Sequence, residues 1–214
     1  MAQREDGKET RIRLLNAACE VFAKKGFRDA KVADICQQAG ANVASVNYYF
    51  GDKASLYTEA WRHSFNEIGE LPLTASAGRA PEDELRDYVY ALMQNFTEQN
   101  ALGRFSRLYM MELVNPTGLI QETWREMIEP RRRKLLEIIQ KIIGEKTDYE
   151  GVLFCEMSIV NQCRALLTIG RSDLEYLLGQ PISPELIRRL TDHIARFSLA
   201  GIKATGGGRD DRNR

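Results

Sequence analysis

The feature that most constrains this chain is the stretch 31–53, KVADICQQAGANVASVNYYFGDK, in which a glycine turn separates two short helical patterns. Before the turn, Val32, Ile35 and Cys36 have the i, i+3 and i+4 spacing that places apolar side chains on one face of a helix. Gly40 then ends this helix, because glycine readily adopts the left-handed backbone found after many helix C-termini. The stretch therefore predicts two helices joined by a tight turn.

The second helix of the pair is expected over about residues 43–50. Asn42 precedes it and suits an N-cap, because a short side-chain oxygen accepts from the unpaired amides of the first turn. Val46 and Phe50 face inward, whereas the other positions carry a hydroxyl, an amide and two phenols. This is the arrangement of a helix-turn-helix that reads the DNA major groove. The spacing also fits an ordinary helical hairpin with a solvated second helix, so it does not decide alone.

Resemblance at the level of residues favours the DNA-binding interpretation. Ala39 and Gly40 are followed by the run YYFGDKASLY at 48–57, which resembles the signature of the TetR family of bacterial transcriptional regulators. Earlier positions also resemble the family, namely Ala17-Ala18, Phe22, Gly26-Phe27 and 32–35. Together with the run at 48–57, the resemblance covers residues 10–57.

Three further runs resemble more narrowly the CecR-type branch of that family: NVASVNYYF at 42–50, VNQC at 160–163 and HIARFSLAG at 193–201. This resemblance implies an all-α fold of about nine helices, in which a three-helix helix-turn-helix DNA-binding domain precedes a larger helical domain. The larger domain is expected to bind a ligand and to dimerise. The expected divisions are 1–53 for the DNA-binding domain, 54–205 for the larger domain and 206–214 for a flexible tail.

Composition sets limits on this interpretation. A chain of 214 residues that is 43 % apolar is long enough to bury a core. The formal net charge is zero, so any DNA-binding surface has to be local. The four cysteines form no CxxC pair, so neither a metal nor a disulfide framework is expected, and no cofactor is expected. No run reaches the roughly 18 apolar residues of a membrane span, so the prediction is a cytoplasmic protein without a membrane partner.

Apolar spacing predicts seven helices outside the recognition pair, at 9–25, 53–70, 81–99, 101–114, 117–144, 148–170 and 183–203. Residues 1–8 are expected to be mobile and 71–81 to form a linker. Pro130 is expected to kink or split the helix 117–144, because proline lacks an amide N–H and clashes with the preceding turn. The basic run 131–134 is expected to be a solvated helical face and not a nucleic-acid patch.

The start of the helix at Val32 departs from the family's usual pattern. The family has a threonine pair where this chain has Ala30 and Lys31, so the usual cap is absent. Asp29 is expected to cap the helix instead, and Lys31 is expected to contact a phosphate as a point charge.

The expected DNA contacts divide by chemistry. The amide of Asn47 suits adenine edges, the hydroxyl of Ser45 suits bases or phosphates, and small apolar side chains suit thymine methyl groups. Phenols and lysines are expected on phosphates, although each tyrosine also fits a packed ring with its hydroxyl in water. The predicted DNA-binding residues are Lys31, Asn42, Val43, Ala44, Ser45, Asn47, Tyr48, Tyr49 and Lys53.

Two helices, 148–170 and 183–203, are expected to form a four-helix interface with a second copy of the chain. The first is apolar almost all round, which requires burial on several sides. A homodimer is also needed for specificity, because one short helix reads few base pairs and two-fold symmetry doubles the contacts over a palindrome. The predicted interface residues are Val152, Cys155, Ile159, Cys163, Leu186, Leu190, Ile194 and Phe197.

Aromatic and polar side chains in the central helices predict a ligand pocket. Such residues line apolar sites with a few polar anchors, which suit a small apolar or amphipathic ligand. Each of them also fits ordinary core packing. The predicted lining residues are Trp61, Phe65, Tyr88, Phe96, Phe105, Arg107, Tyr109, Trp124 and Gln162.

The sequence thus predicts a dimeric transcriptional regulator that binds a palindromic DNA operator and is released by a small molecule, acting as a repressor by analogy with the family. The alternative is a DNA-binding protein without ligand response that is controlled by protein partners. An enzyme is not expected, because the sequence contains no nucleophile motif, phosphate loop or metal-ligand spacing.

Overall fold

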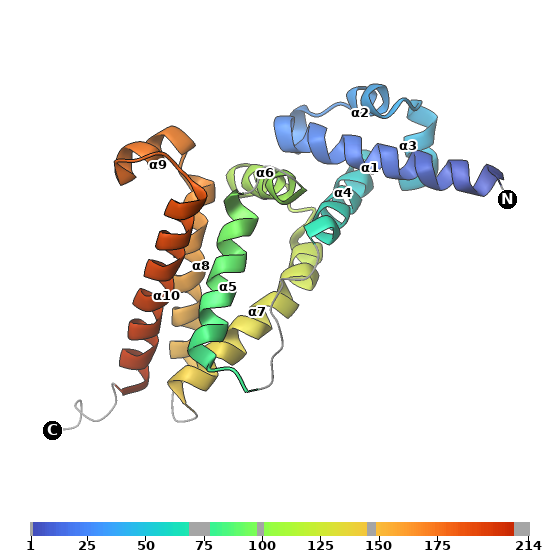
Figure 1. Ribbon diagram of the computed structural model, residues 1–214. Coiled ribbons are helices and arrows are strands. Elements are labelled where there is room, and N and C mark those ends of the chain that lie inside the picture. The colour runs from blue at the N-terminus through green and yellow to red at the C-terminus, as the bar shows by residue number, and fades with distance from the viewer. Residues whose placement is uncertain (1, 69–77, 98–100, 145–148, 208–214) are drawn as a thin grey trace. The chain divides into compact units, whose positions relative to one another are not determined.

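The computed structural model describes residues 2–68, 78–97, 101–144 and 149–207, with side chains except at 2–6, 68, 95–97, 101–102 and 207. Within these residues the chain forms ten α-helices and no strand, which confirms the predicted all-α class (Figure 1). The helices are α1 Ala2–Asp29, α2 Val32–Ala39, α3 Val43–Phe50, α4 Lys53–Ile68, α5 Pro81–Thr97, α6 Ala101–Val114, α7 Gln121–Ile143, α8 Tyr149–Thr168, α9 Arg171–Leu178 and α10 Pro184–Gly207.

The chain divides into two compact units, and each is interrupted in sequence. The first contains residues 1–69 and 98–127, and the second contains 70–97 and 128–214. In the first unit α6 packs on α1 and α4, although it follows them by more than thirty residues. The predicted domain boundary after residue 53 stays a prediction, and the predicted linker lies largely outside the described residues.

Helix α1 is longer than predicted at its N-terminus. Residues 2–8 are helical and not the mobile segment that their polarity indicated. Gln, Arg, Glu and Lys are strong helix formers, so polarity alone did not exclude a helix there. At the other end Gly26 interrupts the helical backbone with φ 69° and ψ 176°, where the sequence predicted closure. The helix resumes after this kink to Asp29.

The prediction that Asp29 caps α2 was wrong. Asp29 is the last residue of α1, and Lys31 occupies the N-cap position of α2 without a side-chain hydrogen bond to the helix. An ion pair of 2.7 Å between Lys25 and Asp34 links α1 to the first turn of α2 instead. Gly40 ends α2 in the left-handed conformation at φ 61°, and its amide bonds to the helix C-terminus as predicted.

The core of the first unit surrounds α1. Leu14, Ala18 and Phe22 are fully buried, and the Cys19 thiol donates to the Ala60 carbonyl of α4 at 3.2 Å. Burial raises the pKa of this thiol to about 12, so Cys19 is a packed, unreactive side chain. These contacts fix the helices that carry α3.

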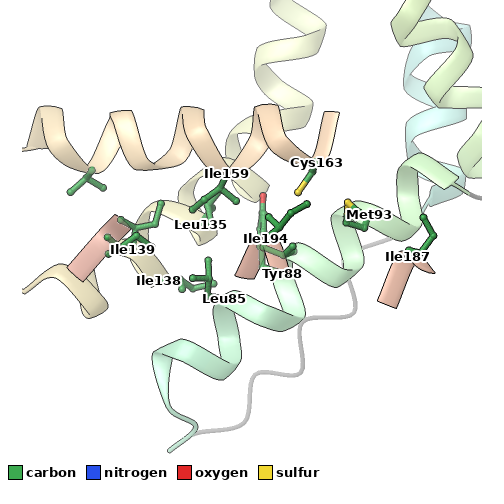
Figure 2. Packing of buried hydrophobic residues seen from close by; sticks show 13 residues of the cluster. Leu85, Tyr88, Met93, Leu135, Ile138, Ile139, Ile159, Cys163, Ile187 and Ile194 are labelled. Carbon is green, nitrogen blue, oxygen red and sulfur yellow. The ribbon is translucent and has the colours of Figure 1, made fainter. Parts of the chain in front are cut away.

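In the second unit α5, α8 and α10 pack against one another (Figure 1). Figure 2 shows the buried side chains that these helices and α7 direct into a shared core. The cluster contains Leu85, Tyr88, Val89, Met93, Leu135, Ile138, Ile139, Val152, Ile159, Cys163, Ile187, Ile194 and Ile202.

Helix α7 passes through Pro130 without a split, and it begins at Gln121, later than predicted. The basic run after the proline is not simply solvated as expected. Arg132 pairs at 2.8 Å with Glu156, a residue that is only 9 % exposed, and Lys134 pairs with Glu84 at 3.2 Å. Because acids that are largely shielded from water require nearby cations, these two pairs stabilise the second unit.

Helix α8 is buried along one stripe and not on several sides within the chain. Val152, Glu156, Ile159 and Cys163 form the buried stripe. The opposite face carries apolar side chains that remain exposed. Helix α9 was missed by the sequence prediction, because its eight residues offer only Leu174 as a buried position.

Helix α10 extends to Gly207, so the predicted tail does not begin at Gly206. A Cβ atom at Gly206 would lie 2.8 Å from the Ile143 carbonyl oxygen of α7. The glycine therefore allows α10 to continue past the end of α7, and the rest of the predicted tail lies outside the described residues. No single described helix is long and apolar enough to cross a membrane; only α8 and α9 taken together, across a 114° bend, pass that test.

Candidate nucleic-acid interface

The recognition helix α3 is capped as the sequence predicted. The Asn42 side-chain oxygen accepts from the Ser45 amide at 2.8 Å, and the Ser45 hydroxyl donates to the same oxygen at 3.0 Å. Val46 and Phe50 are buried and anchor the inner face of α3 in the first unit. A helix fixed at its first turn and along its inner face presents the outer side chains at defined positions.

The outer face of α3 is open to solvent. Asn42, Val43, Ala44 and Asn47 are exposed, and Tyr48 is 82 % exposed. These residues offer two amides, two small apolar groups and a phenol that suit base edges and phosphates. Their exposure is consistent with the predicted contacts to bases and phosphates, which stay predictions.

Ser45 and Tyr49 are less available than the other predicted contacts. Ser45 is half-buried, and its hydroxyl proton is used by Asn42 within the cap. The Tyr49 ring meets Tyr48 edge to face at 4.9 Å, and its hydroxyl oxygen lies beside Gly7 of α1. Both residues therefore support the shape of the interface in this structure.

Lys53 is held in place at the start of α4. Its Nζ atom donates to the Arg28 carbonyl at 3.3 Å and lies 4.7 Å from the centre of the Phe27 ring. Burial lowers the pKa of Lys53, although the nearby Asp29 charge opposes this effect. The ammonium group is fixed on the surface of the first unit, where a phosphate would have to compete with the Arg28 carbonyl. Lys31, in contrast, is exposed at the start of α2.

One residue that supports the interface was missed by the sequence prediction. The Arg11 guanidinium of α1 lies 5.2 Å from the centre of the Phe50 ring and forms an ion pair with Glu59 of α4. It therefore joins α1, the end of α3 and α4. Only the tertiary structure brings positions so far apart in sequence together.

Part of the predicted ligand pocket forms an aromatic cluster in the first unit. Trp61 meets Phe105 at 5.3 Å between ring centres, and Tyr109 stacks on Trp124 at 4.8 Å. Phe65 extends the cluster through its contact of 5.4 Å with Phe105. The rings come from α4, α6 and α7, so the structure joins them into one apolar region.

The other predicted pocket residues do not join this cluster. Arg107 is exposed on α6. Tyr88 lies in the core of the second unit, where its hydroxyl donates to the Arg131 carbonyl at 3.2 Å. Gln162 donates to the Ser158 carbonyl and to the Ser198 hydroxyl, which lies on α10. The side chain of Phe96 lies outside the described residues.

The predicted dimer residues require a correction. Val152, Ile159, Cys163, Leu186 and Ile194 are buried in the core of their own chain and are not available to a second copy. The prediction selected the inner stripe of each helix because apolar spacing marks a buried face without naming what buries it. Cys155 and Leu190 are half-buried, and Phe197 is exposed.

The exposed apolar side chains of α8 and α10 lie outside the buried stripes of these two helices. Phe154 is 58 %, Met157 59 % and Phe197 63 % exposed. Phe154 and Phe197 line a groove of about 190 Å³ between α8 and α10, together with Cys155 and Ser198. Large apolar side chains gathered on one face mark a surface for association.

Comparison with protein families matches both parts of the chain. The family model for the HTH-type transcriptional dual regulator CecR, C-terminal domain, matches residues 81–202. The model for bacterial regulatory proteins of the tetR family matches residues 14–60, which include the recognition pair.

Individual relatives agree with these matches. The HTH-type transcriptional regulator AcrR of Shigella flexneri is 28 % identical over 205 residues, which cover 93 % of this chain and 79 % of AcrR. The dual regulator CecR of the same organism is 26 % identical over 149 residues, 64 % of this chain and 66 % of CecR. The structure of the regulator FadR from Bacillus subtilis in complex with stearoyl-CoA has a TM-score of 0.67 at 15 % identity, covers 89 % of this chain and 98 % of FadR, and supports the fold alone. The chain therefore belongs to the TetR family of DNA-binding transcriptional regulators, in its CecR-like branch.

Proposed function

We propose that two copies of the chain bind a palindromic operator through their α3 helices and leave the DNA when a small molecule binds. The observation that carries this proposal is the state of α3: Asn42 caps it, Val46 and Phe50 anchor it, and its outer face is exposed. A recognition helix ordered before binding loses little conformational entropy when it enters the major groove. Occupancy of a promoter by such a dimer blocks transcription, so repression is the proposed effect.

The exposed face of α8 and α10 supports the dimer. Phe154, Met157 and Phe197 cannot be covered by the helices that carry them, and a second copy would bury them by presenting the same face. The proposed interface thus keeps the two predicted helices and replaces their inner residues by the exposed ones.

The aromatic cluster supports the ligand response. Rings from α4, α6 and α7 meet there, so an apolar or amphipathic molecule that enters the cluster would alter the packing of α4, the helix that follows α3. FadR, whose fold is similar, is known in complex with stearoyl-CoA. A long apolar chain with a polar head group is therefore the first class of ligand to test.

Fluorescence anisotropy with the protein's own promoter region, at two salt concentrations and with an unrelated duplex as control, tests the DNA claim. We expect tight binding to a palindromic segment at two chains per site. Asn47→Ala should relax base preference at one position of each half-site, whereas Asn115→Ala, an exposed amide between α6 and α7, should leave it unchanged. Equal weak binding to both duplexes at both salts would contradict the proposed function.

The two tryptophans of the chain, Trp61 and Trp124, both lie in the aromatic cluster, so intrinsic fluorescence reports directly on it. Acyl-CoA thioesters and other amphipathic compounds should change this fluorescence, raise the melting temperature and release the promoter DNA. A compound that releases the DNA without changing the tryptophan signal would place the ligand elsewhere. If no metabolite released the DNA, control by a protein partner would replace ligand response.

A further inference from the structure

The first two turns of α1 lie next to the recognition helix. The helix begins at Ala2, where the sequence predicted a mobile segment. The family match begins only at residue 14, so these turns precede the part of the chain that the match covers. The family match therefore assigns no role to them.

Two observations place the N-terminal part of α1 beside the end of α3, one in its second turn and one in its third. A Cβ atom built on Gly7 would lie 3.2 Å from the hydroxyl oxygen of Tyr49, closer than ordinary van der Waals contact. One turn later the guanidinium of Arg11 lies over the ring of Phe50. Residues four apart share a helix face, so the face of α1 that contains Gly7 and Arg11 is turned to the end of α3.

Glycine at position 7 permits this approach. An alanine methyl group at this position would require the Tyr49 hydroxyl or α1 to move by a few tenths of an ångström, although alanine is otherwise the better helix former by about 1 kcal/mol. Tyr49 therefore acts as a positioning residue between the two helices. This role differs from the direct phosphate contact that the sequence indicated.

Lys8 lies beside this contact. It is exposed and follows Gly7 directly, about 100° further round the helix. A recognition helix in the major groove, which is about 12 Å wide, has a sugar-phosphate backbone on each side. A basic side chain on an element next to α3 is therefore brought close to phosphates, which recruit lysine as a point charge.

We propose that the first two turns of α1 are part of the DNA-binding surface, held beside α3 by the Gly7–Tyr49 contact, with Lys8 bound to a backbone phosphate. The proposal rests on the proposed function, because it assumes that α3 enters the major groove. It adds a contact that does not depend on base sequence and therefore raises the affinity for all sequences.

The first test compares Lys8→Ala with Lys24→Ala. Both lysines are exposed on α1, and sixteen residues, or about 24 Å, separate them. Lys8→Ala should lower the affinity for operator and for unrelated DNA by the same several-fold factor. It should also reduce the slope of the logarithm of the binding constant against the logarithm of the salt concentration by about 1 for each protomer. Lys24→Ala should change neither the affinity nor the slope. If wild-type protein binds its operator specifically and the two variants are indistinguishable, this inference is wrong while the proposed function stands. If wild-type protein shows no preference for the operator, the proposed function itself fails.

The second test is a double-mutant cycle of Gly7→Ala and Tyr49→Phe. Gly7→Ala should lower operator affinity several-fold without lowering helix content or melting temperature. Removal of the hydroxyl oxygen that meets the new methyl group should restore the affinity of the double variant to that of Tyr49→Phe. An alanine variant that binds like wild type, or a loss that persists undiminished in the double variant, would overturn the positioning role of Gly7 and Tyr49.

Discussion

The hydroxyl of Tyr57 on α4 donates a hydrogen bond of 2.8 Å to the Glu112 carboxylate on α6. The same carboxylate accepts from the Thr117 amide at 2.8 Å and from its hydroxyl at 3.0 Å, so it also fixes the turn between α6 and α7. The Tyr57 ring packs edge to face on Phe22 of α1 at 4.8 Å. One acidic side chain thus links the turn before α7 to the helices that support α3.

Removing either partner should destabilise the first unit by different amounts. Tyr57→Phe should cost about 1 to 2 kcal/mol, because Glu112 keeps its bonds to Thr117. Glu112→Ala should cost more, because it also leaves the buried Tyr57 hydroxyl and the Thr117 amide without their acceptor. Chemical denaturation of both single variants and the double variant measures the coupling. Tyr176→Phe, at a tyrosine that is 86 % exposed, is the control and should change stability little. If the losses of the two single variants simply add in the double variant, the bond between Tyr57 and Glu112 is unimportant.

Substitutions at Asn42 should separate helix capping from DNA contact. Asn42→Ala removes the cap of α3 and should cost about 1 kcal/mol of stability and weaken DNA binding. Asn42→Asp keeps a side-chain acceptor and should preserve stability, but its negative charge should weaken binding to DNA. Asn42→Ser keeps an acceptor without adding charge and should also preserve stability. Thermal melts and operator titrations check these outcomes, and an alanine variant as stable as wild type would contradict the capping role.

Charged substitutions on the exposed face of α8 should break the proposed dimer. Phe154→Glu or Met157→Glu places charges opposite their two-fold copies, which should convert dimers to monomers and lower operator affinity. Tyr176→Glu on α9 is the matched control, because this side chain is 86 % exposed and lies outside the proposed interface. Analytical ultracentrifugation measures the assembly state. Unchanged dimers in both α8 variants would place the interface elsewhere.

Glu84 should make stability depend on pH in the acid range. Burial opposes its ionisation, but hydrogen bonds and charges from Lys134 and Lys141 outweigh burial and hold the pKa of Glu84 below its ordinary value of 4.5. The folded state therefore binds this proton less readily than the unfolded state, and the stabilisation is present above pH 4.5 and lost as pH falls through the lower folded pKa.

Glu84→Gln should consequently lower the free energy of unfolding near pH 7 by about 1 kcal/mol, a modest value because Lys141 is half exposed and screened by solvent. The difference from wild type should disappear in acid. Glu137→Gln removes the same charge from an exposed position of α7 and should have little effect at any pH. Equal behaviour of the two variants in pH-dependent denaturation would contradict the assignment.

Alanine substitutions at two glycines of α10 should have opposite effects. Gly206→Ala should destabilise the second unit by about 1 to 3 kcal/mol, because the new methyl group meets backbone atoms of α7 at Ile143. Gly201→Ala meets nothing within 4 Å and should stabilise the helix by up to about 1 kcal/mol. Melting temperatures of the two variants compare them directly. A stabilised Gly206→Ala variant would show that α10 does not approach α7 closely.

The sequence by itself determined the local features of this protein. Asn42 caps α3, Gly40 ends α2, and Val46 and Phe50 mark the inner face of α3, because each of these effects depends on residues only a few positions apart. The same local signals placed nearly all the helices, and the residues of the recognition pair carried the resemblance that identified the family.

Tertiary structure decided what each face meets. Apolar spacing marked α8 as a buried helix, but only the packing of α5 and α10 shows that its Val152 stripe serves the chain's own core and leaves Phe154 exposed. The positions of Gly7 beside Tyr49 and of Gly206 beside Ile143 likewise depend on segments far apart in sequence. Helix periodicity gives the direction of a side chain relative to its own helix axis, whereas the partner on that side is set by the packing of the whole chain.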